Sequence, residues 1–530
     1  MERQSPSIFN DIVGPVMVGP SSSHTCAPSR LGYLCRQLVG GKLTKVVIEF
    51  AREGAYTEMY QGQRSDMGFV NGLLGHRPED VRLRDAFRLA EAAGLEVRFE
   101  ISDFTPIKPN LSRMTLWDDA GEQVEAYTDS TGGGTVKILA VDGFETAITG
   151  DCYEMLIFAA VAGGAADTLF DTCKGIAGTL EGAHLSQKEG RSLVNLKTRK
   201  PVAETVITQI EALPGVEKVR VVTPILKVAS NWGAQLPFRS AAELLCLAEK
   251  EDKPLWEMGV AYEMARGDLS RDDVLTYMGE VIDIMESGVK EALKGEIDMH
   301  GVLQPTAGKI DRFMQTDSRA LDMGLLTTMV PWSMAAMEYS SAMGVVVCAP
   351  TGGSAGVFPG AVLGAAEALG LSREEKIKLM LTTAVIGIVM SKDCNYSAEL
   401  YGCQVEPGAA SAMAAGALVY LMDGTAAQSL AAASCATQNI LGIICDPVAG
   451  LVQLPCISRN ASAVANSLIS ANMVMGGYNP IIPLDEAAET MFRIGAQLPL
   501  ELRCTCKGGL CTTPCGQKLA KEQAERDKHR

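Results

Sequence analysis

Residues 409–421 read AASAMAAGALVYL, and residues 426–436 read AAQSLAAASCA. Alanine, glycine and serine recur in both stretches at helical spacing, and such small side chains let helix backbones approach closely. This helical periodicity dominates the chain from about residue 240 onward. It predicts a tightly packed, all-α C-terminal domain over residues 240–517. The remaining residues, 518–530, are rich in Lys, Glu and Arg and are expected to form a frayed polar tail.

The chain before residue 240 has a different pattern. Residues 1–148 mix short strand-like runs with helical stretches, which predicts an α/β domain. Residues 151–225 follow the order strand–helix–strand–strand–helix–strand, which is the ferredoxin-like order. This unit resembles an ACT domain, a module that often binds amino acids, although a spacer or dimerisation role is an equal alternative. The predicted fold class is therefore α+β, with three domains.

Charge and hydropathy disfavour several classes of protein. The formal net charge is −16, whereas binding a phosphate backbone requires a basic surface. The most apolar windows, residues 325–347 and 379–390, are short or interrupted, and a membrane span needs about 20 apolar residues in a row. The first thirty residues lack the pattern of a signal peptide. We therefore expect a cytoplasmic protein with neither a nucleic-acid nor a membrane partner, and a homodimer as the commonest assembly.

The chain has 15 cysteines, and ten of them lie between Cys348 and Cys515. Disulfides are rare in reducing compartments, so these thiols are buried apolar groups, redox groups or metal ligands. Three of them are spaced distinctively, with 41 residues between Cys403 and Cys445 and ten between Cys445 and Cys456. Soft thiolates suit iron–sulfur clusters, and three ligands would leave one iron open. Buried structural cysteines are the alternative interpretation.

Two further strings indicate a binding site for a small anion. GPSSSHT spans Gly19–Thr25, ahead of a predicted helix, and CAPTGGSAG spans Cys348–Gly356, after the strand-like run Val345–Val347. Consecutive hydroxyls and exposed backbone N–H groups can both hold a carboxylate. His24 is one of only five histidines. A lone histidine is more often structural than functional, but the unusual string around it favours function.

Together, the strings GPSSSHT, APTGGSAG, GCQ…EPGAASAMAAGAL and CDPVAGLVQLPCISRNA resemble the iron–sulfur-dependent L-serine dehydratases. The similarity covers nearly the whole chain, with residues 1–148 similar to that family's β part and residues 240–517 to its α part. The resemblance implies that Cys403, Cys445 and Cys456 bind a [4Fe–4S] cluster. It also implies conversion of L-serine to pyruvate and ammonia, with the open iron acting as a Lewis acid on the β-hydroxyl.

The resemblance also implies the residues of the active site. His24, with Ser22 and Ser23, is expected to be catalytic. The substrate, a small amino acid, is expected to be held by two groups of residues: Ser21, Ser22, Ser23 and Thr25, and Thr351, Gly352, Gly353 and Ser354. No lysine lies in the Ser-x-Lys-like context of the pyridoxal-phosphate dehydratases, so we expect no pyridoxal phosphate.

The sequence departs from the family at three places. Gln63 stands where a histidine is usual, and glutamine cannot act as a general base at neutral pH. Ser354–Gly356 and Asp393–Ser397 replace the usual Ala-Cys-Gly and Asn-Ala-Ser-Ile-Ser. These changes leave open another β-substituted amino acid as substrate, such as threonine or cysteine. They also leave open a catalytically inactive, amino-acid-binding regulatory relative.

The C-terminal segment has four closely spaced thiols, at Cys504, Cys506, Cys511 and Cys515. This density is typical of small zinc sites. The family has a similar Gly-Gly-Leu…Thr-Pro string but usually lacks these thiols, and in some members the chain end enters the active site as a temporary cluster ligand. We hypothesise that one thiol caps the open iron or that the set binds a second metal. Reactive or incidental thiols are the alternative.

Overall fold

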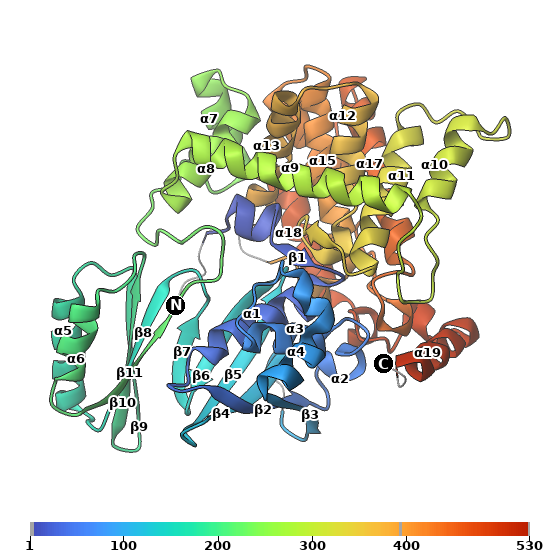
Figure 1. Cartoon of the computed structure of the whole chain (residues 1–530). Coiled ribbons are helices and arrows are strands. Elements are labelled where there is room, and N and C mark those ends of the chain that lie inside the picture. Colours follow the sequence, from blue (N-terminus) through green and yellow to red (C-terminus); the bar gives the residue numbers. More distant parts are fainter. Residues whose placement is uncertain (1–4, 106, 392–394, 528–530) are drawn as a thin grey trace.

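The computed structural model describes residues 5–105, 107–391 and 395–527. Its N-terminal part is a six-stranded sheet in the order β3-β2-β4-β5-β6-β7, in which only β2 and β3 are parallel. Figure 1 shows helices α1, α3 and α4 over one face of this sheet. The elements are β2 (Leu43–Ala51), β3 (Glu96–Ser102), β4 (Leu111–Asp118), β5 (Gln123–Gly132), β6 (Thr135–Val141), β7 (Phe144–Ile148), α1 (Ala27–Arg36), α2 (Tyr56–Met59), α3 (Ser65–Leu73) and α4 (Ala86–Ala93).

The alternation of side chains explains this layer. In β4 the residues Met114 and Leu116 are fully buried, while their neighbours Arg113 and Thr115 are partly exposed. Because successive side chains of a strand point to opposite faces, this pattern places one face of the sheet against the helices. The predicted mixture of strands and helices over residues 1–148 is therefore present.

A second, smaller sheet forms the outlying lobe of Figure 1. Its strand order is β11-β8-β10-β9, all antiparallel, and α5 and α6 contact each other beside it. The predicted strand–helix–strand–strand–helix–strand order is therefore present. Its elements are β8 (Tyr153–Ala159), α5 (Gly164–Ala177), β9 (Gly182–Lys188), β10 (Arg191–Thr198), α6 (Glu204–Glu211) and β11 (Val216–Val222).

The C-terminal part is helical and surrounds α15. The helix α15 contacts α13, α16 and α17, and its residues 407–419 are all buried. A Cβ at Gly416 would lie 2.9 Å from the backbone oxygen of Ser429, so α15 and α16 approach closely because the residue there is glycine. The helices of this part are α7 (Ala241–Glu251), α8 (Leu255–Gly267), α9 (Arg271–Leu293), α10 (Ala307–Thr316), α11 (Leu326–Ser341), α12 (Ala365–Ala368), α13 (Arg373–Met390), α14 (Ala398–Tyr401), α15 (Pro407–Leu421), α16 (Ala426–Asn439), α17 (Cys456–Met475) and α18 (Leu484–Gln497).

One short strand pair joins the N-terminal segment to the helical part of the chain. β1 (Val16–Val18) pairs antiparallel with β12 (Val345–Val347), so Val16 lies opposite Val347. The strand-like run predicted at residues 345–347 is therefore present. β1 leads directly into the string Gly19–Thr25, and β12 leads directly into the string Cys348–Gly356.

The end of the chain differs from the prediction. Instead of a frayed tail, residues 514–527 form α19 (Pro514–Asp527), which lies against the turn at residues 448–450. Arg526 donates to the backbone oxygen of Gly301 at 2.7 Å. Composition suggested disorder here because the helix is polar on nearly every side, whereas its order comes from contacts with distant parts of the chain.

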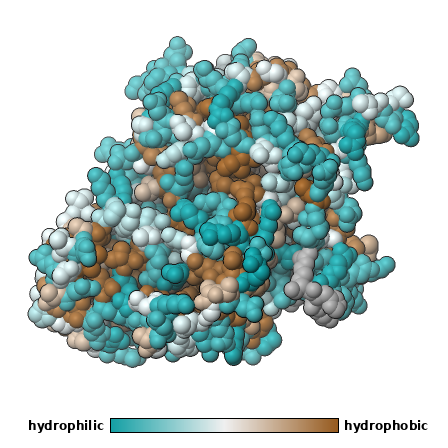
Figure 2. Space-filling model, in the orientation of Figure 1, coloured by the Kyte–Doolittle hydropathy of each residue, from teal (hydrophilic) through white to brown (hydrophobic). Residues whose placement is uncertain are grey.

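The helices and the surface of the protein show how its apolar residues are distributed. Within the described ranges, no helix is both long and apolar enough to cross a membrane. Figure 2 shows apolar surface where the helical part meets the N-terminal sheet domain. A groove of about 230 Å³ between β1 and α9 is lined there by Val16, Val281 and Ile284.

Candidate functional site

The two predicted anion-binding strings are in direct contact. The backbone N–H of Gly352 donates to the hydroxyl of Ser22 at 3.1 Å. A Cβ at Gly352 would lie 2.7 Å from the backbone nitrogen of Ser22, closer than real Cβ contacts. Glycine is therefore required there so that the two loops can touch.

His24 lies in a short π-helical turn, Ser22–Cys26, and its side chain is fully buried. Its Nδ1 is 3.5 Å from Oε1 of Glu399, which is buried at the start of α14. Burial lowers the pKa of His24, although the nearby Glu399 carboxylate opposes the effect. The imidazole is therefore neutral at pH 7, and neither ring nitrogen has a hydrogen-bond partner in the described part of the chain.

Glu399 is held by two hydroxyl groups. Ser23 donates to its Oε1 at 2.7 Å, and Ser397 donates to its Oε2 at 2.8 Å. Burial alone would raise the pKa of Glu399, but the charge of a protonated His24 and the hydrogen bonds from the two hydroxyls lower it below its ordinary value. The imidazole thus faces a carboxylate whose ionised form is stabilised, in a site shielded from water.

The other predicted hydroxyls contribute to loop structure. Ser21 accepts from the backbone N–H of His24 at 3.1 Å, and Thr25 donates to the backbone oxygen of Gln63 at 2.7 Å. Ser354 accepts from the backbone N–H of Thr351 at 3.1 Å. The hydroxyls of Ser21, Thr25 and Ser354 therefore hold the two strings in shape.

Glu406 connects the glycine loop to the thiols. It accepts a hydrogen bond of 2.7 Å from the Thr351 hydroxyl, and the Cys403 thiol is 3.7 Å from its Oε2. A Cβ at Gly353 would lie 2.8 Å from the Glu406 carboxylate oxygens. Burial raises the pKa of Glu406 to about 7, so this carboxyl group can exist in either protonation state near neutral pH.

Two of the three predicted metal ligands converge closely. Ligand atoms of Cys403, Cys445 and Glu406 all lie within 4.8 Å of one another. Cys456 is the first residue of α17 and is buried. It lies near Cys403 and Glu406, whose charges affect its pKa, but it is outside the closest group. Burial raises the pKa of Cys456 well above its ordinary value. Cysteines buried in this way become stable thiolates only when a cation binds to them.

Arg459 supplies positive charge beside these thiols. Its Nη1 lies 3.8 Å from the Cys403 sulfur, and its Nη2 forms a 2.8 Å ion pair with Asp446. Nη1 also donates to the backbone oxygen of Ile444. A fixed guanidinium beside Cys403 favours an anionic metal–sulfur centre.

The C-terminal thiols fall into separate groups. Cys504 contacts Cys445 through a thiol hydrogen bond, and its backbone N–H donates to the Cys445 oxygen at 2.9 Å. Cys506 and Cys511 lie together beside Pro447. Cys515 is exposed. Within the described part of the chain, the only group of metal-ligating atoms that close together is that of Cys403, Glu406 and Cys445, so nothing supports a second metal site at the tail.

Comparison with known proteins assigns this arrangement to a family. The model of the serine dehydratase alpha chain family matches residues 247–511, half of the chain. The probable L-serine dehydratase alpha chain of Bacillus subtilis (strain 168) is 35% identical over 285 residues, which cover 54% of this chain and 95% of that one. The chain belongs to the serine dehydratase alpha chain family.

Two other relatives extend the comparison. The probable L-serine dehydratase beta chain of Bacillus subtilis (strain 168) is 34% identical over 205 residues, 39% of this chain and 86% of that one. L-serine dehydratase 1 of Escherichia coli (strain K12) is 31% identical over 289 residues, 53% of this chain and 63% of that one. The resemblance seen in the sequence strings is therefore confirmed at the level of the family.

The departures from the family pattern lie at the edge of the site. The Gln63 side chain donates to the Met59 sulfur at 3.2 Å, and Met59 packs with Cys403 and Cys445. Of the altered segment 393–397, residues 393 and 394 lie outside the described residues. Its last residue, Ser397, is one of the two hydroxyls that hold Glu399.

A small cleft reaches this polar centre from the surface. It has a volume of about 210 Å³, and Glu399 lies in its lining together with Arg503, Lys108 and Lys507. Arg503 donates from Nη1 to the Leu400 backbone oxygen, while its Nε is buried without a partner in the described structure. Three cationic side chains line an opening in a protein whose net charge is −16.

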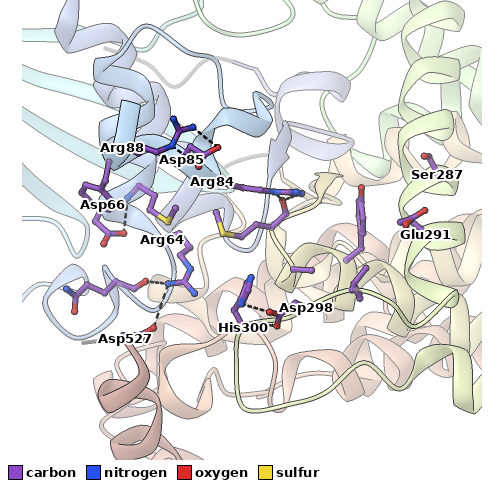
Figure 3. A pocket seen from close by; sticks show the side chains of 17 residues that line it. Arg64, Asp66, Arg84, Asp85, Arg88, Ser287, Glu291, Asp298, His300 and Asp527 are labelled. Atoms are coloured by element: carbon purple, nitrogen blue, oxygen red, sulfur yellow. Dashed lines mark hydrogen bonds and ion pairs between the residues drawn. The ribbon is translucent and has the colours of Figure 1, made fainter. Parts of the chain in front are cut away.

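A larger cavity lies elsewhere (Figure 3). Its volume is about 1030 Å³, and its charged lining includes Arg64, Asp66, His300 and Asp527. These residues come from the N-terminal domain, the α9–α10 connection and α19. The predicted site residues, all of which are described, are absent from its lining.

Sequence reasoning missed Glu399, Arg459 and the role of Glu406. Glu406 and Arg459 stand inside the quoted strings, three residues after Cys403 and three after Cys456. A charged residue at that spacing from a ligand cysteine is a signal that could have been used. Nothing in the sequence around Glu399 indicates its pairing with His24.

Proposed function

We propose that this chain is an L-serine ammonia-lyase, which converts L-serine to pyruvate and ammonia. One observation carries the proposal: the buried thiols Cys403 and Cys445 and the buried His24–Glu399 pair lie beside the contact between the loops Gly19–Thr25 and Cys348–Gly356. The thiols can hold a metal centre, and the pair can accept a proton. Elimination of water requires both a proton acceptor and help for the leaving hydroxide.

The donor set fits a [4Fe–4S] cluster held by Cys403, Cys445 and Cys456. Soft sulfur ligands, their burial and the adjacent Arg459 guanidinium all suit such a group. When bound, a cluster with one open iron supplies a Lewis acid that makes the β-hydroxyl of serine a better leaving group. Pyridoxal phosphate has no part in the proposal.

Within this proposal, His24 accepts the α-proton of the substrate. Its neutral, buried imidazole has an unpaired nitrogen ready to take a proton. The Glu399 carboxylate, 3.5 Å away, would stabilise the imidazolium formed in that step. Ser23 and Ser397 keep the carboxylate in place and ionised.

The substrate carboxylate and amino group are held by residues of the two loops in this proposal. Ser21–Thr25 and Thr351–Ser354 supply hydroxyl and backbone N–H groups around one point, where Gly352 meets Ser22. The cleft beside Glu399 is the proposed entrance. Its volume of about 210 Å³ is large enough to admit a small amino acid.

Purification under anaerobic conditions tests the proposal directly. We expect bound iron and sulfide, and pyruvate formed from L-serine, both lost in Cys403→Ser, Cys445→Ser and Cys456→Ser. Cys435→Ser is the matched control, because Cys435 is a buried free thiol of α16. Full activity in a protein reconstituted without iron would contradict the proposed cofactor.

The identity of the substrate is tested in the same assay. The altered residues Gln63 and Ser354 motivate threonine and cysteine as competing substrates, and each would also release ammonia. An iron-loaded protein inactive on all three amino acids, but binding one of them, would favour the regulatory relative. Location in the cytoplasm, a homodimer and an effector-binding ACT-like unit at residues 151–225 stay predictions.

A further inference from the structure

Two thiols of the C-terminal segment share one hydrogen-bond acceptor. The Cys506 sulfur lies 3.5 Å and the Cys511 sulfur 3.2 Å from the backbone oxygen of Pro447. The two sulfurs are also close enough for Cys506 to donate to Cys511 instead of to Pro447. The sequence places them five positions apart, and the fold brings their reactive atoms into contact.

The backbone of this segment has an unusual conformation. Cys504 and Cys506 both have a φ of 58°, in the left-handed region that residues other than glycine seldom adopt. Residues in such conformations cluster at functional sites, where the surrounding structure maintains the strain. Here the strained conformation places Cys506 beside Cys511.

The two thiols differ in a way that suits thiol–disulfide exchange. Cys506 is partly exposed, so a dissolved reagent can reach it, whereas Cys511 is 8% exposed. The hydrogen bond from Cys506 lowers the pKa of Cys511, although burial opposes the effect. An accessible thiol beside a buried one is the arrangement of an attacking and a resolving cysteine, and the lowered pKa of Cys511 favours the thiolate that the resolving step needs.

We propose that Cys506 and Cys511 are a redox site, which forms a reversible disulfide by exchange with a low-molecular-weight disulfide. The Cys506 thiolate attacks one sulfur of the reagent, whose S–S bond breaks and releases one thiolate. The Cys511 thiolate then attacks the Cys506 sulfur of the mixed disulfide and displaces the second thiolate. The protein loses two electrons and two protons, and the reagent becomes two thiols.

Formation of the disulfide affects the loop of residues 445–451, which begins at Cys445. In the reduced state both thiols donate to Pro447, two residues after Cys445, and Leu510 donates from its backbone to Asp446 at 2.8 Å. A disulfide removes both S–H donors, so the Pro447 oxygen loses these two hydrogen bonds. We expect residues 445–451 to open more often in the oxidised protein.

The experiment uses the full-length holoenzyme under anaerobic conditions, incubated with glutathione disulfide. Free thiols are then alkylated, and tryptic peptides are analysed by mass spectrometry. We expect a link between peptides 504–507 and 508–518 that dithiothreitol reverses. Cys515→Ser should keep the link, whereas Cys506→Ser and Cys511→Ser should reduce its yield by at least about tenfold.

The outcomes separate this proposal from the proposed enzymatic function. The link is a covalent product, so it is measured whether or not the protein acts on serine. A link that persists in Cys506→Ser through Cys504, a Cys445–Cys504 link, or Cys506 remaining only as its glutathione adduct would each overturn the proposal. Hydrogen exchange at residues 445–451 provides a second measurement, and unchanged exchange after oxidation would refute the coupling to the loop.

Discussion

The imidazole of His24 lies 3.5 Å from the carboxylate of Glu399, with both side chains almost completely buried. The first residue belongs to the N-terminal string and the second to the segment just before Cys403. Their contact joins the two halves of the proposed active site. It also supplies a proton acceptor in a chain that has Gln63 where the family usually has a histidine.

Replacing Glu399 by glutamine tests that role. The amide keeps the size and the hydroxyl contacts of Glu399 but cannot stabilise a charged His24. We expect kcat for pyruvate formation to fall by about 10²–10⁴-fold, while iron content stays the same. Glu374→Gln, at an exposed position on α13, is the control. Unchanged kcat in Glu399→Gln would exclude the pair from proton transfer.

The same pair predicts how stability depends on pH. Burial lowers the pKa of His24 below 6.5, so the unfolded chain binds this proton more readily than the folded protein. The stabilising contribution of the neutral imidazole is therefore complete above about pH 6.5 and is lost as the pH falls from there towards the lowered pKa. The slope is at most about 1.4 kcal/mol per pH unit.

His24→Asn removes that contribution to the pH dependence. We expect the melting temperature of the wild type to fall more steeply than that of the variant between about pH 6.5 and 5. His184→Asn, at a half-buried position of β9, should behave like the wild type. Parallel curves for wild type and His24→Asn would show that His24 is not held neutral by burial.

Local pattern was sufficient to predict much of the fold. β12 has the predicted bounds Val345–Val347, and α15 is buried on every side, as its small and apolar residues predict. Both features depend on side chains close together in the sequence. The helix α19 escaped prediction because its order depends on contacts such as Arg526 with Gly301, which are distant in the sequence.

The same distinction applies to the candidate site. Cys403 and Cys445 could be found from their spacing together with the resemblance, and the structure places them together. Glu399 could not be found, because its importance comes from a contact with His24, which is distant in the sequence. The hydroxyl of Thr25, for which the resemblance implies a role in substrate binding, donates to the backbone oxygen of Gln63.

A buried ion pair stabilises the contact between the smaller and the larger sheet. Lys197 donates to Glu154 at 2.6 Å and to the backbone oxygen of Ala147 at 2.7 Å, so it ties the smaller sheet to β7 of the larger one. Lys197→Met leaves a buried carboxylate without its cation. We expect a loss of about 3–5 kcal/mol of unfolding free energy. Fluorescence of Trp232, whose ring lies under the ammonium group, reports the transition.

The control for that substitution is an exposed pair. Lys174 and Asp171 lie on the surface of α5 in the same domain. Lys174→Met should change the unfolding free energy by less than about 1 kcal/mol. If both variants unfold at the same denaturant concentration, the Lys197 pair does not stabilise the junction.

We expect a side chain in the cleft beside Glu399 to affect substrate binding without affecting the chemical step. Arg503 has a buried Nε without a partner, and it lines the proposed entrance with Lys108 and Lys507. A carboxylate entering the cleft would satisfy that donor with a charge-assisted hydrogen bond. Arg503→Gln should therefore raise the KM for L-serine by about tenfold, with kcat nearly unchanged. Lys518→Gln, on the exposed surface of α19, should leave both constants unaltered. A fall in kcat at constant KM would instead place Arg503 among the groups that hold the thiol loop, because its neighbour Cys504 contacts Cys445.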